Sequence, residues 1–267
     1  MKNNTITTLT FSTLTSEEVN KVLDEKTLFI PFGTIEQHGP HLPLSVDCNI
    51  PEAICSKLAQ QCNGIVAPTI SYGARSLPQS GGGHIFPGTI YVRGEILIQY
   101  YFDILTSFIK SGAKRILILN GHYENEAFIF EAFDLLRERE LLPECKVIAL
   151  SWWSVVPTSL VEELFDSKFI GWHAEHASLV ETSLMMYLFS SLVNSIRVNH
   201  DTPQQSGIMK YPVIDKDISC RGVLYRTTEA NANCGEIIFN KVIEEISMIC
   251  VSQFSENLER LEPIKYE

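Results

Sequence analysis

Short runs of Ile, Val and Leu alternate along the chain with longer segments whose apolar residues recur at helical spacing. The runs that predict buried strands are Leu28–Gly33, Ile65–Ile70, Arg115–Gly121 and Lys146–Trp153. The amphipathic segments that predict helices are Pro51–Cys62, Glu95–Lys110 and Glu124–Leu141. Because strand and helix alternate, we expect an α/β fold: a mostly parallel sheet flanked by helices on both faces, in three layers.

The second half of the chain is less regular. It predicts a helix near residues 178–188, a Pro- and Gly-punctuated loop over 202–222, and a final helix over 235–261. No repeat or linker divides the chain, so we expect a single domain spanning residues 1–267.

Composition and charge narrow the possible partners. With 45% hydrophobic and 20% charged residues, the composition is that of a soluble globular protein. The net charge of −11 disfavours nucleic acid as a partner. The polar N-terminus and the lack of a long apolar run give no sign of a signal peptide or a membrane span, so we expect a cytoplasmic protein. The seven cysteines contain no C-x-x-C pair and predict no disulfide framework.

Acidic and imidazole side chains follow two of the predicted strands. Glu36 and His38 come after the first strand, and His122 and Glu124 repeat the same spacing after the third. Residues two apart in extended backbone point the same way, and the carboxyl ends of parallel strands meet at one sheet edge. Asp47 can fold back onto this edge through the Gly and Pro turns that precede it. We therefore expect the five side chains to converge.

Three carboxylates and two imidazoles in one place predict a metal centre. Without cations the carboxylates would repel and be forced to protonate, whereas two divalent ions leave room for a bridging hydroxide. Mixed His and Asp/Glu ligation without thiolates suits zinc or manganese. The chemistry that these residues imply is metal-assisted hydrolysis.

A third polar cluster lies at residues 171–183. Trp172, His173, Glu175 and His176 would place an apolar wall beside acid/base groups, which suits a small planar polar substrate. A simpler interpretation has Ser178 as a helix N-cap with Glu181 closing a capping box, and both can hold together. The glycine run at residues 81–83 lacks the lysine of a phosphate-binding loop, and no G-x-S-x-G motif supports a serine hydrolase.

Several motifs together make the chain resemble the creatininase (creatinine amidohydrolase) family. They are E-Q-H-G-P-H-L-P at residues 36–43, S-G-G-G-H-I-F-P-G-T at 80–89, N-G-H-Y-E-N at 120–125, L-S-W-W at 150–153, G-W-H-A-E-H at 171–176 with V-E-T-S at 180–183, and G-V-L-Y-R-T-T-E-A-N-A-N-C-G-E at 222–236. The resemblance runs from near the start of the chain to the final helix.

The resemblance implies a role for each site residue. One ion, often manganese, would be held by Glu36, Asp47 and His122, and the other, usually zinc, by His38, Asp47 and Glu124, with two zinc ions as the alternative pairing. Substrate-contacting or catalytic positions would be Ser80, Tyr123, Trp172, Glu175 and His176, with Trp153 closing over the site. Family members assemble as homohexamers and interconvert creatinine and creatine.

The reaction implied is reversible opening of the creatinine ring by a metal-bridged hydroxide, with His176, oriented by a carboxylate such as Glu175 or Glu181, protonating the departing ring nitrogen. One position departs from the family: His173 stands where creatininase carries an Asp that contacts substrate. The loss of that carboxylate keeps open a related amide or formamide hydrolase with another small substrate. A non-catalytic metal-binding protein is disfavoured because metal storage needs no positioned Glu175 and His176.

Overall fold

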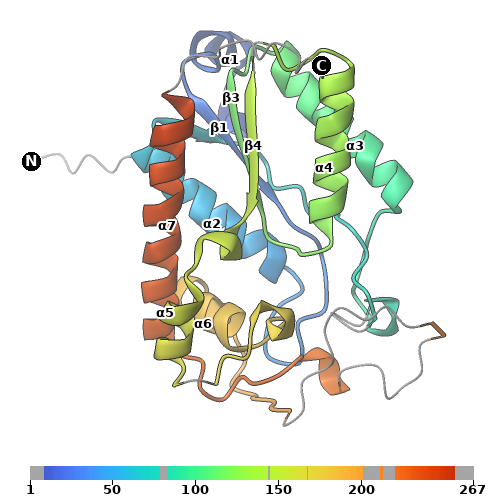
Figure 1. The fold of residues 1–267 in the computed structure, drawn as a ribbon, viewed down its shortest axis with the longest axis vertical. Coiled ribbons are helices and arrows are strands. Elements are labelled where there is room, and N and C mark those ends of the chain that lie inside the picture. The colour runs from blue at the N-terminus through green and yellow to red at the C-terminus, as the bar shows by residue number, and fades with distance from the viewer. Residues whose placement is uncertain are drawn as a thin grey trace, which may run out of the picture.

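Four parallel strands form the centre of the molecule (Figure 1). The computed structural model describes residues 9–78, 83–143, 145–166, 168–200, 211–212 and 220–255. The strands are β1 (Thr27–Phe32), β2 (Gly64–Val66), β3 (Arg115–Asn120) and β4 (Lys146–Ser151), in the order β2-β1-β3-β4. All neighbouring pairs are parallel, with Phe32 of β1 opposite Asn120 of β3 and Asn120 opposite Ser151 of β4. The carboxyl ends of these three strands therefore lie level at one edge.

Helices cover both faces of this sheet (Figure 1). On one face α3 (Gly94–Lys110) and α4 (Asn125–Glu138) pack over the side chains of Leu28, Ile30 and Phe32. On the other face α2 (Val46–Gln61), α6 (Leu179–Leu188) and α7 (Ala232–Phe254) share a core with Phe29. Successive β1 side chains thus enter opposite cores, as strand geometry requires. The predicted three-layer α/β fold is confirmed.

The remaining described elements are short. Helix α1 (Ser16–Val22) begins with a capping box in which Thr15 and Glu18 bond each other's backbone N–H. Helix α5 (Thr158–Leu164) follows β4, and neither helix was predicted. Turns of 3₁₀ helix lie at Phe11–Thr13, Gly83–Ile85, Trp152–Val155, Trp172–Ala174, Ser190–Leu192 and Cys220–Gly222. No helix among the described residues is both long enough and apolar enough to cross a membrane.

Helix α2 begins at Val46, not at Pro51 as expected, and so takes Asp47 into its first turn. Pro51 has no N–H, so it leaves the carbonyl oxygen of Asp47 without its usual intrahelical donor. That oxygen packs against the backbone where β1 and β3 end: a Cβ built on Gly33 or on Gly121 would lie 2.3 Å from it. Glycine at both positions lets the start of α2 approach the sheet edge directly.

Other boundaries differ by a few residues. Strand β2 ends at Val66, although an isolated bridge still joins Ile70 to Phe32. Helix α4 ends at Glu138, shortly before Glu140 adopts a positive φ of 54°. Most of the predicted loop over 202–222, and the part of the predicted final helix beyond residue 255, lie outside the described residues.

Candidate metal centre and active site

The predicted convergence occurs at the carboxyl edge of the sheet. The loop after β1 carries Glu36 and His38, the first turn of α2 carries Asp47, and the loop after β3 carries His122. Each of these four residues is at most 4% exposed. Two acids and two imidazoles are therefore withdrawn from water, which is costly unless they are paired or bound to a cation.

His122 forms the first cluster with two carboxylates. Its Nδ1 atom lies 3.2 Å from Glu36 Oε2 and 3.1 Å from Asp47 Oδ2. One ligand atom from each of the three residues falls within 4.8 Å of the others, close enough for all to bind one ion. This is the trio that the resemblance assigns to one of the two ions.

A second cluster forms around His38. Its Nε2 atom lies 3.1 Å from Asp47 Oδ1 and 3.7 Å from Glu181 Oε2. His38, His176 and Glu181 form a group whose ligand atoms lie within 4.8 Å of one another. The two oxygens of Asp47 therefore face different imidazoles, Oδ1 toward His38 and Oδ2 toward His122. Such a carboxylate can bridge two ions.

The donor set fits a pair of divalent cations. Glu36 Oε2, His38 Nε2 and Asp47 Oδ2 are buried and form no hydrogen bond of normal geometry. Buried polar atoms in folded proteins are nearly always satisfied, so three such atoms aimed at one another need an explanation. Imidazole nitrogen and carboxylate oxygen are ligands that zinc and manganese accept, and cations would satisfy all three atoms.

Glu124 joins neither cluster. Its Oε2 atom lies 3.3 Å from His122 Nε2, across the imidazole ring from Glu36 and Asp47, and its Oε1 accepts from the Leu77 N–H. Next to His38, where the resemblance placed Glu124, the structure has Glu181. Sequence reasoning missed the position of Glu181 beside His38 because Glu181 looked like half of a capping box; the available signal was an acid in the otherwise apolar first turn of α6.

The polar residues that precede α6 do not form the predicted capping box. Ser178 makes no side-chain cap, and Glu181 Oε2 accepts instead from the Ala177 N–H at 2.6 Å. Glu175 caps the helix: its carboxylate accepts from Val180 N at 2.8 Å. Burial raises the pKa of Glu175 well above its usual range, although the hydrogen bonds that its carboxylate accepts from backbone N–H groups of α6 oppose the shift. Its catalytic and substrate-binding role stays a prediction.

His176 lies where it can serve the site as an acid or base. Its ring stacks on that of His38, with centroids 4.4 Å apart, and its Nε2 is 4.0 Å from Glu36 Oε1. The same Nε2 is 2.9 Å from both the backbone oxygen and the side-chain nitrogen of Gln37, a contact that sequence reasoning missed. The Gln37 amide also donates to Gly222 O, which ties it to the loop before α7.

Another buried imidazole lies just behind the site. His41 is fully buried between the loop after β1 and helix α6, and its Nε2 is 2.9 Å from Thr182 Oγ1. Burial lowers the pKa of His41 to about 4, and the neighbouring Arg197 charge adds to this shift. His41 is therefore neutral at pH 7.

Burial and charge shift the other groups in different directions. Burial would lower the pKa of His38, but the Asp47 and Glu181 carboxylates outweigh it and raise that pKa to about 10. Burial raises the pKa of Glu181 to about 7 against the opposing charge of His38. Burial lowers the pKa of His176 to about 4, with Glu36 opposing the shift. His176 is thus an unprotonated base at neutral pH.

The aromatic side chains near the end of β4 and before α6 pack on one another. Trp172 packs edge-on against both Trp152 and Phe169, and Trp152 packs edge-on against Trp153. Tyr123 is 66% exposed, and His173 is exposed as well. Ser80 lies outside the described residues. The three tryptophans therefore belong to one packed aromatic group, while Tyr123 and His173 face solvent; the apolar wall beside the acid/base groups stays a prediction.

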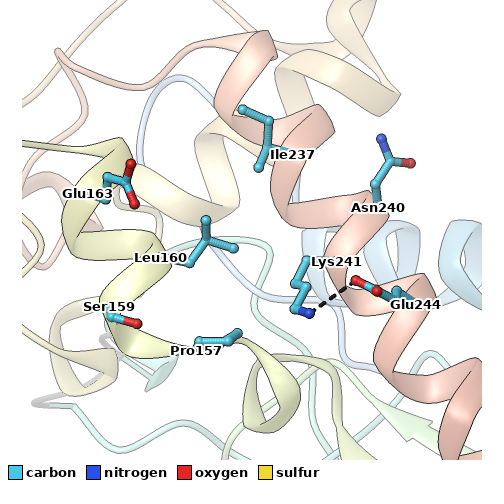
Figure 2. Close-up of a pocket in the computed structure, with 8 residues that line it drawn as sticks. All are labelled: Pro157, Ser159, Leu160, Glu163, Ile237, Asn240, Lys241 and Glu244. Carbon is cyan, nitrogen blue, oxygen red and sulfur yellow. Dashed lines mark hydrogen bonds and ion pairs between the residues drawn. The ribbon is translucent and has the colours of Figure 1, made fainter.

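A cleft elsewhere contains none of the predicted site residues. It measures about 700 Å³ and lies between α5 and α7, with Leu160 and Ile237 on its walls and the Lys241–Glu244 ion pair on one side (Figure 2). No cluster of potential metal ligands among the described residues includes a residue of this cleft. It is a surface feature separate from the metal centre.

Comparison with known proteins finds similarity to this chain in sequence and in fold. The family model described as Creatininase: Creatinine amidohydrolase matches residues 12–250. The creatinine amidohydrolase of Pseudomonas putida is 36% identical over 225 residues, which cover 82% of this chain and 86% of that protein. A 3-dehydro-scyllo-inosose hydrolase of Thermotoga maritima is 28% identical over 189 residues, covering 69% of this chain and 57% of that protein.

Solved creatininase structures superpose on almost the whole of this chain. A manganese form gives a TM-score of 0.88 at 32% identity and covers 93% of this chain and 100% of that one. A mutant of Zn–Zn type also gives 0.88 at 32% identity, covering 93% and 99%. The chain therefore belongs to the creatininase family and is a hydrolase of the kind that acts on C–N bonds in cyclic amides.

Proposed function

We propose that the protein hydrolyses the ring amide of creatinine reversibly to give creatine, using two divalent metal ions. The observation that carries this proposal is the pair of ligand groups, Glu36–Asp47–His122 and His38–His176–Glu181, with the two oxygens of Asp47 facing His122 and His38. A single acid/imidazole cluster would suit metal storage equally well. Two groups that one carboxylate faces, together with a neutral base, suit hydrolysis.

The ligand assignment follows the positions of the side chains. We propose that Glu36, Asp47 and His122 hold one ion and that His38, Asp47 and Glu181 hold the other, as zinc and manganese or as two zinc ions. Ions bound there would polarise the carbonyl group of the substrate and would lower the pKa of a bound water. The Glu181 carboxylate replaces Glu124 in this assignment because it lies beside His38.

In the proposed reaction His176 accepts and donates the proton. With its pKa lowered to about 4, the ring is unprotonated at neutral pH and can accept a proton at Nε2. Gln37 then serves both states of that nitrogen: its side-chain N–H can donate to the bare nitrogen, and its backbone oxygen can accept from the protonated one. From Nε2 the proton would pass to the departing ring nitrogen. Glu124, only partly exposed beside His122, is proposed as a further catalytic residue.

Substrate binding is proposed to use the aromatic wall. Trp172 and Trp153 offer flat apolar surface for a planar ring, and Tyr123, Ser80, His173 and Glu175 stay proposed contacts. A second candidate function, hydrolysis of a related amide or formamide, is favoured by one observation: His173 stands where creatininase carries an Asp. A homohexameric assembly and a cytoplasmic location stay predictions from the resemblance and from composition.

The test is creatine formation from creatinine by the purified protein. The protein is stripped with a chelator and assayed before and after zinc or manganese is added. We expect turnover only in the metal-loaded samples. A folded protein that binds two ions and leaves creatinine intact would contradict the substrate assignment, and a panel of cyclic amides and formamides would then be assayed with the same samples.

A further inference from the structure

Asn125, the first residue of α4, lies close to the proposed metal centre in sequence but is not one of its proposed ligands. It is completely buried. Its backbone N–H donates to the His122 carbonyl, but none of its side-chain contacts is to the His122 ring. Nothing in the proposed chemistry uses it, so its burial needs another reason.

The Asn125 side chain uses its full hydrogen-bonding capacity. Its Oδ1 accepts from Ala74 N at 2.8 Å and from the Tyr101 hydroxyl at 3.1 Å. Its Nδ2 donates to Gly33 O and to Asn120 Oδ1, each at 3.2 Å. A primary amide has two donors and two acceptor sites, and here all four are used. Because Ala74 N can only donate and Gly33 O can only accept, the amide has one orientation.

Two of these four partners hold His122 directly. Asn120 Nδ2 donates to the His122 carbonyl at 2.7 Å, and Asn120 Oδ1 accepts from the His122 N–H at 3.2 Å. On the far side of the ring, His122 Nε2 lies 3.1 Å from Ala74 O. One buried amide therefore fixes both the backbone of His122 and the carbonyl that its ring faces.

The contact with Ala74 also decides which ring nitrogen faces the metal clusters as a lone pair. A carbonyl oxygen can only accept, and the Glu124 carboxylate at 3.3 Å is a second acceptor on the same side. His122 Nε2 must therefore carry a hydrogen, so a cation bound between the ring and the Glu36 and Asp47 carboxylates would meet the lone pair of Nδ1. Partners of this kind orient metal-binding histidines in proteins generally.

We propose that Asn125 is a positioning residue, which holds Ala74 and Asn120 so that His122 presents Nδ1 to a metal ion. The inference rests on the proposed metal centre, but not on the identity of the substrate. It predicts that loss of the Asn125 amide weakens metal binding while the fold is retained.

The test compares Asn125→Asp and Asn125→Ser with the matched control Tyr101→Phe. The aspartate keeps the size of the side chain but sets an acceptor against Gly33 O and Asn120 Oδ1, and the serine shortens it. The control removes one of the four bonds and keeps the ring of Tyr101, which packs on Phe32. Zinc and manganese affinities are measured by chelator competition. The protonated nitrogen of His122 is assigned by NMR in zinc-loaded protein labelled with ¹⁵N-histidine.

We expect both Asn125 variants to lose about 10- to 100-fold in metal affinity, the range typical of such outer partners. Tyr101→Phe should keep its affinity, and its His122 should stay protonated on Nε2. A folded Asn125 variant with unchanged affinity and unchanged His122 protonation would overturn the proposal. Failure of both variants to fold would overturn it too, since Asn125 would then serve the fold as a whole.

The same measurements separate this inference from the proposed function. A wild-type protein that binds no zinc or manganese contradicts both. A wild-type protein that binds two ions without acting on creatinine contradicts only the substrate, and the affinity comparison still decides the role of Asn125.

Discussion

The imidazole rings of His38 and His176 stack with centroids 4.4 Å apart and an angle of 40° between their planes, yet they have different surroundings. The His38 ring faces the Asp47 and Glu181 carboxylates. The His176 ring faces the backbone oxygen and side-chain amide of Gln37. Two adjacent histidines can thus divide the work, with His38 holding metal and His176 carrying the proton.

Replacement of His176 separates these tasks. His176→Ala should keep both metal ions, because Glu181 and Asp47 still accompany His38, and should lower kcat by about 10²- to 10⁴-fold, the usual contribution of a general acid or base. Metal content by elemental analysis and kcat on the same preparation check this. A variant that lost one ion together with its activity would make His176 a ligand.

The roles of Glu181 and Glu124 are distinguished by a pair of matched substitutions. Glu181→Gln should reduce bound metal from two ions toward one, since this carboxylate is 3.7 Å from His38 Nε2. Glu124→Gln should keep two ions, because Glu124 lies on the other side of the His122 ring. Both variants keep side-chain size, so elemental analysis reports ligation. The reverse pattern would restore Glu124 as the second ligand.

Asp47 is the residue whose loss should affect both ions. Asp47→Asn keeps the shape of the side chain but removes the charge that faces both His38 and His122, so we expect one ion or none and no measurable turnover. The surface variant Asp134→Asn, on the exposed side of α4, serves as the control and should behave as wild type. Two bound ions and full activity in Asp47→Asn would refute a bridging role.

His41 should make the stability of the metal-free protein fall in acid. Its pKa is about 4 in the folded state, below the usual histidine value of 6.5, so between these values the unfolded chain binds more protons than the folded one. Its contribution to the free energy of unfolding is therefore complete above about pH 6.5 and decreases as the pH falls toward 4. Urea unfolding of the wild type and of His41→Gln at pH 7 and pH 5 tests this. The variant should lose less stability than the wild type between the two pH values, and an equal loss would contradict the assignment.

The strands and the first metal cluster were predictable because their signals are local. Runs such as Ile116 to Leu119 are buried on both faces, and the spacing of Glu36 and His38 places both in one loop after a strand. The contribution of α6 was not predictable in this way. Glu181 lies 143 residues after His38, and only packing brings them together, while its local sequence matches a helix cap equally well.

Other misses have local physical causes. Pro51 looked like the first residue of a helix, but here it lies in the second turn of α2. Because it has no N–H, it makes no intrahelical hydrogen bond to the Asp47 carbonyl oxygen. Glu175 is expected to act on the substrate, and its carboxylate also caps the N-terminus of α6, a use that the sequence did not indicate. In both cases a residue type has two common uses, and the choice between them depends on neighbours that are distant in sequence.

The close packing of α2 on the sheet edge bears on any attempt to transplant this site into another scaffold. The position of Asp47 depends on Gly33 and Gly121, which have no side chain, and on Pro51, which lacks a donor. None of the three has any chemistry to offer a substrate or an ion. A designer who copied only the ligands would obtain the right chemical groups at the wrong separation, so these three positions belong to the minimal specification of the centre.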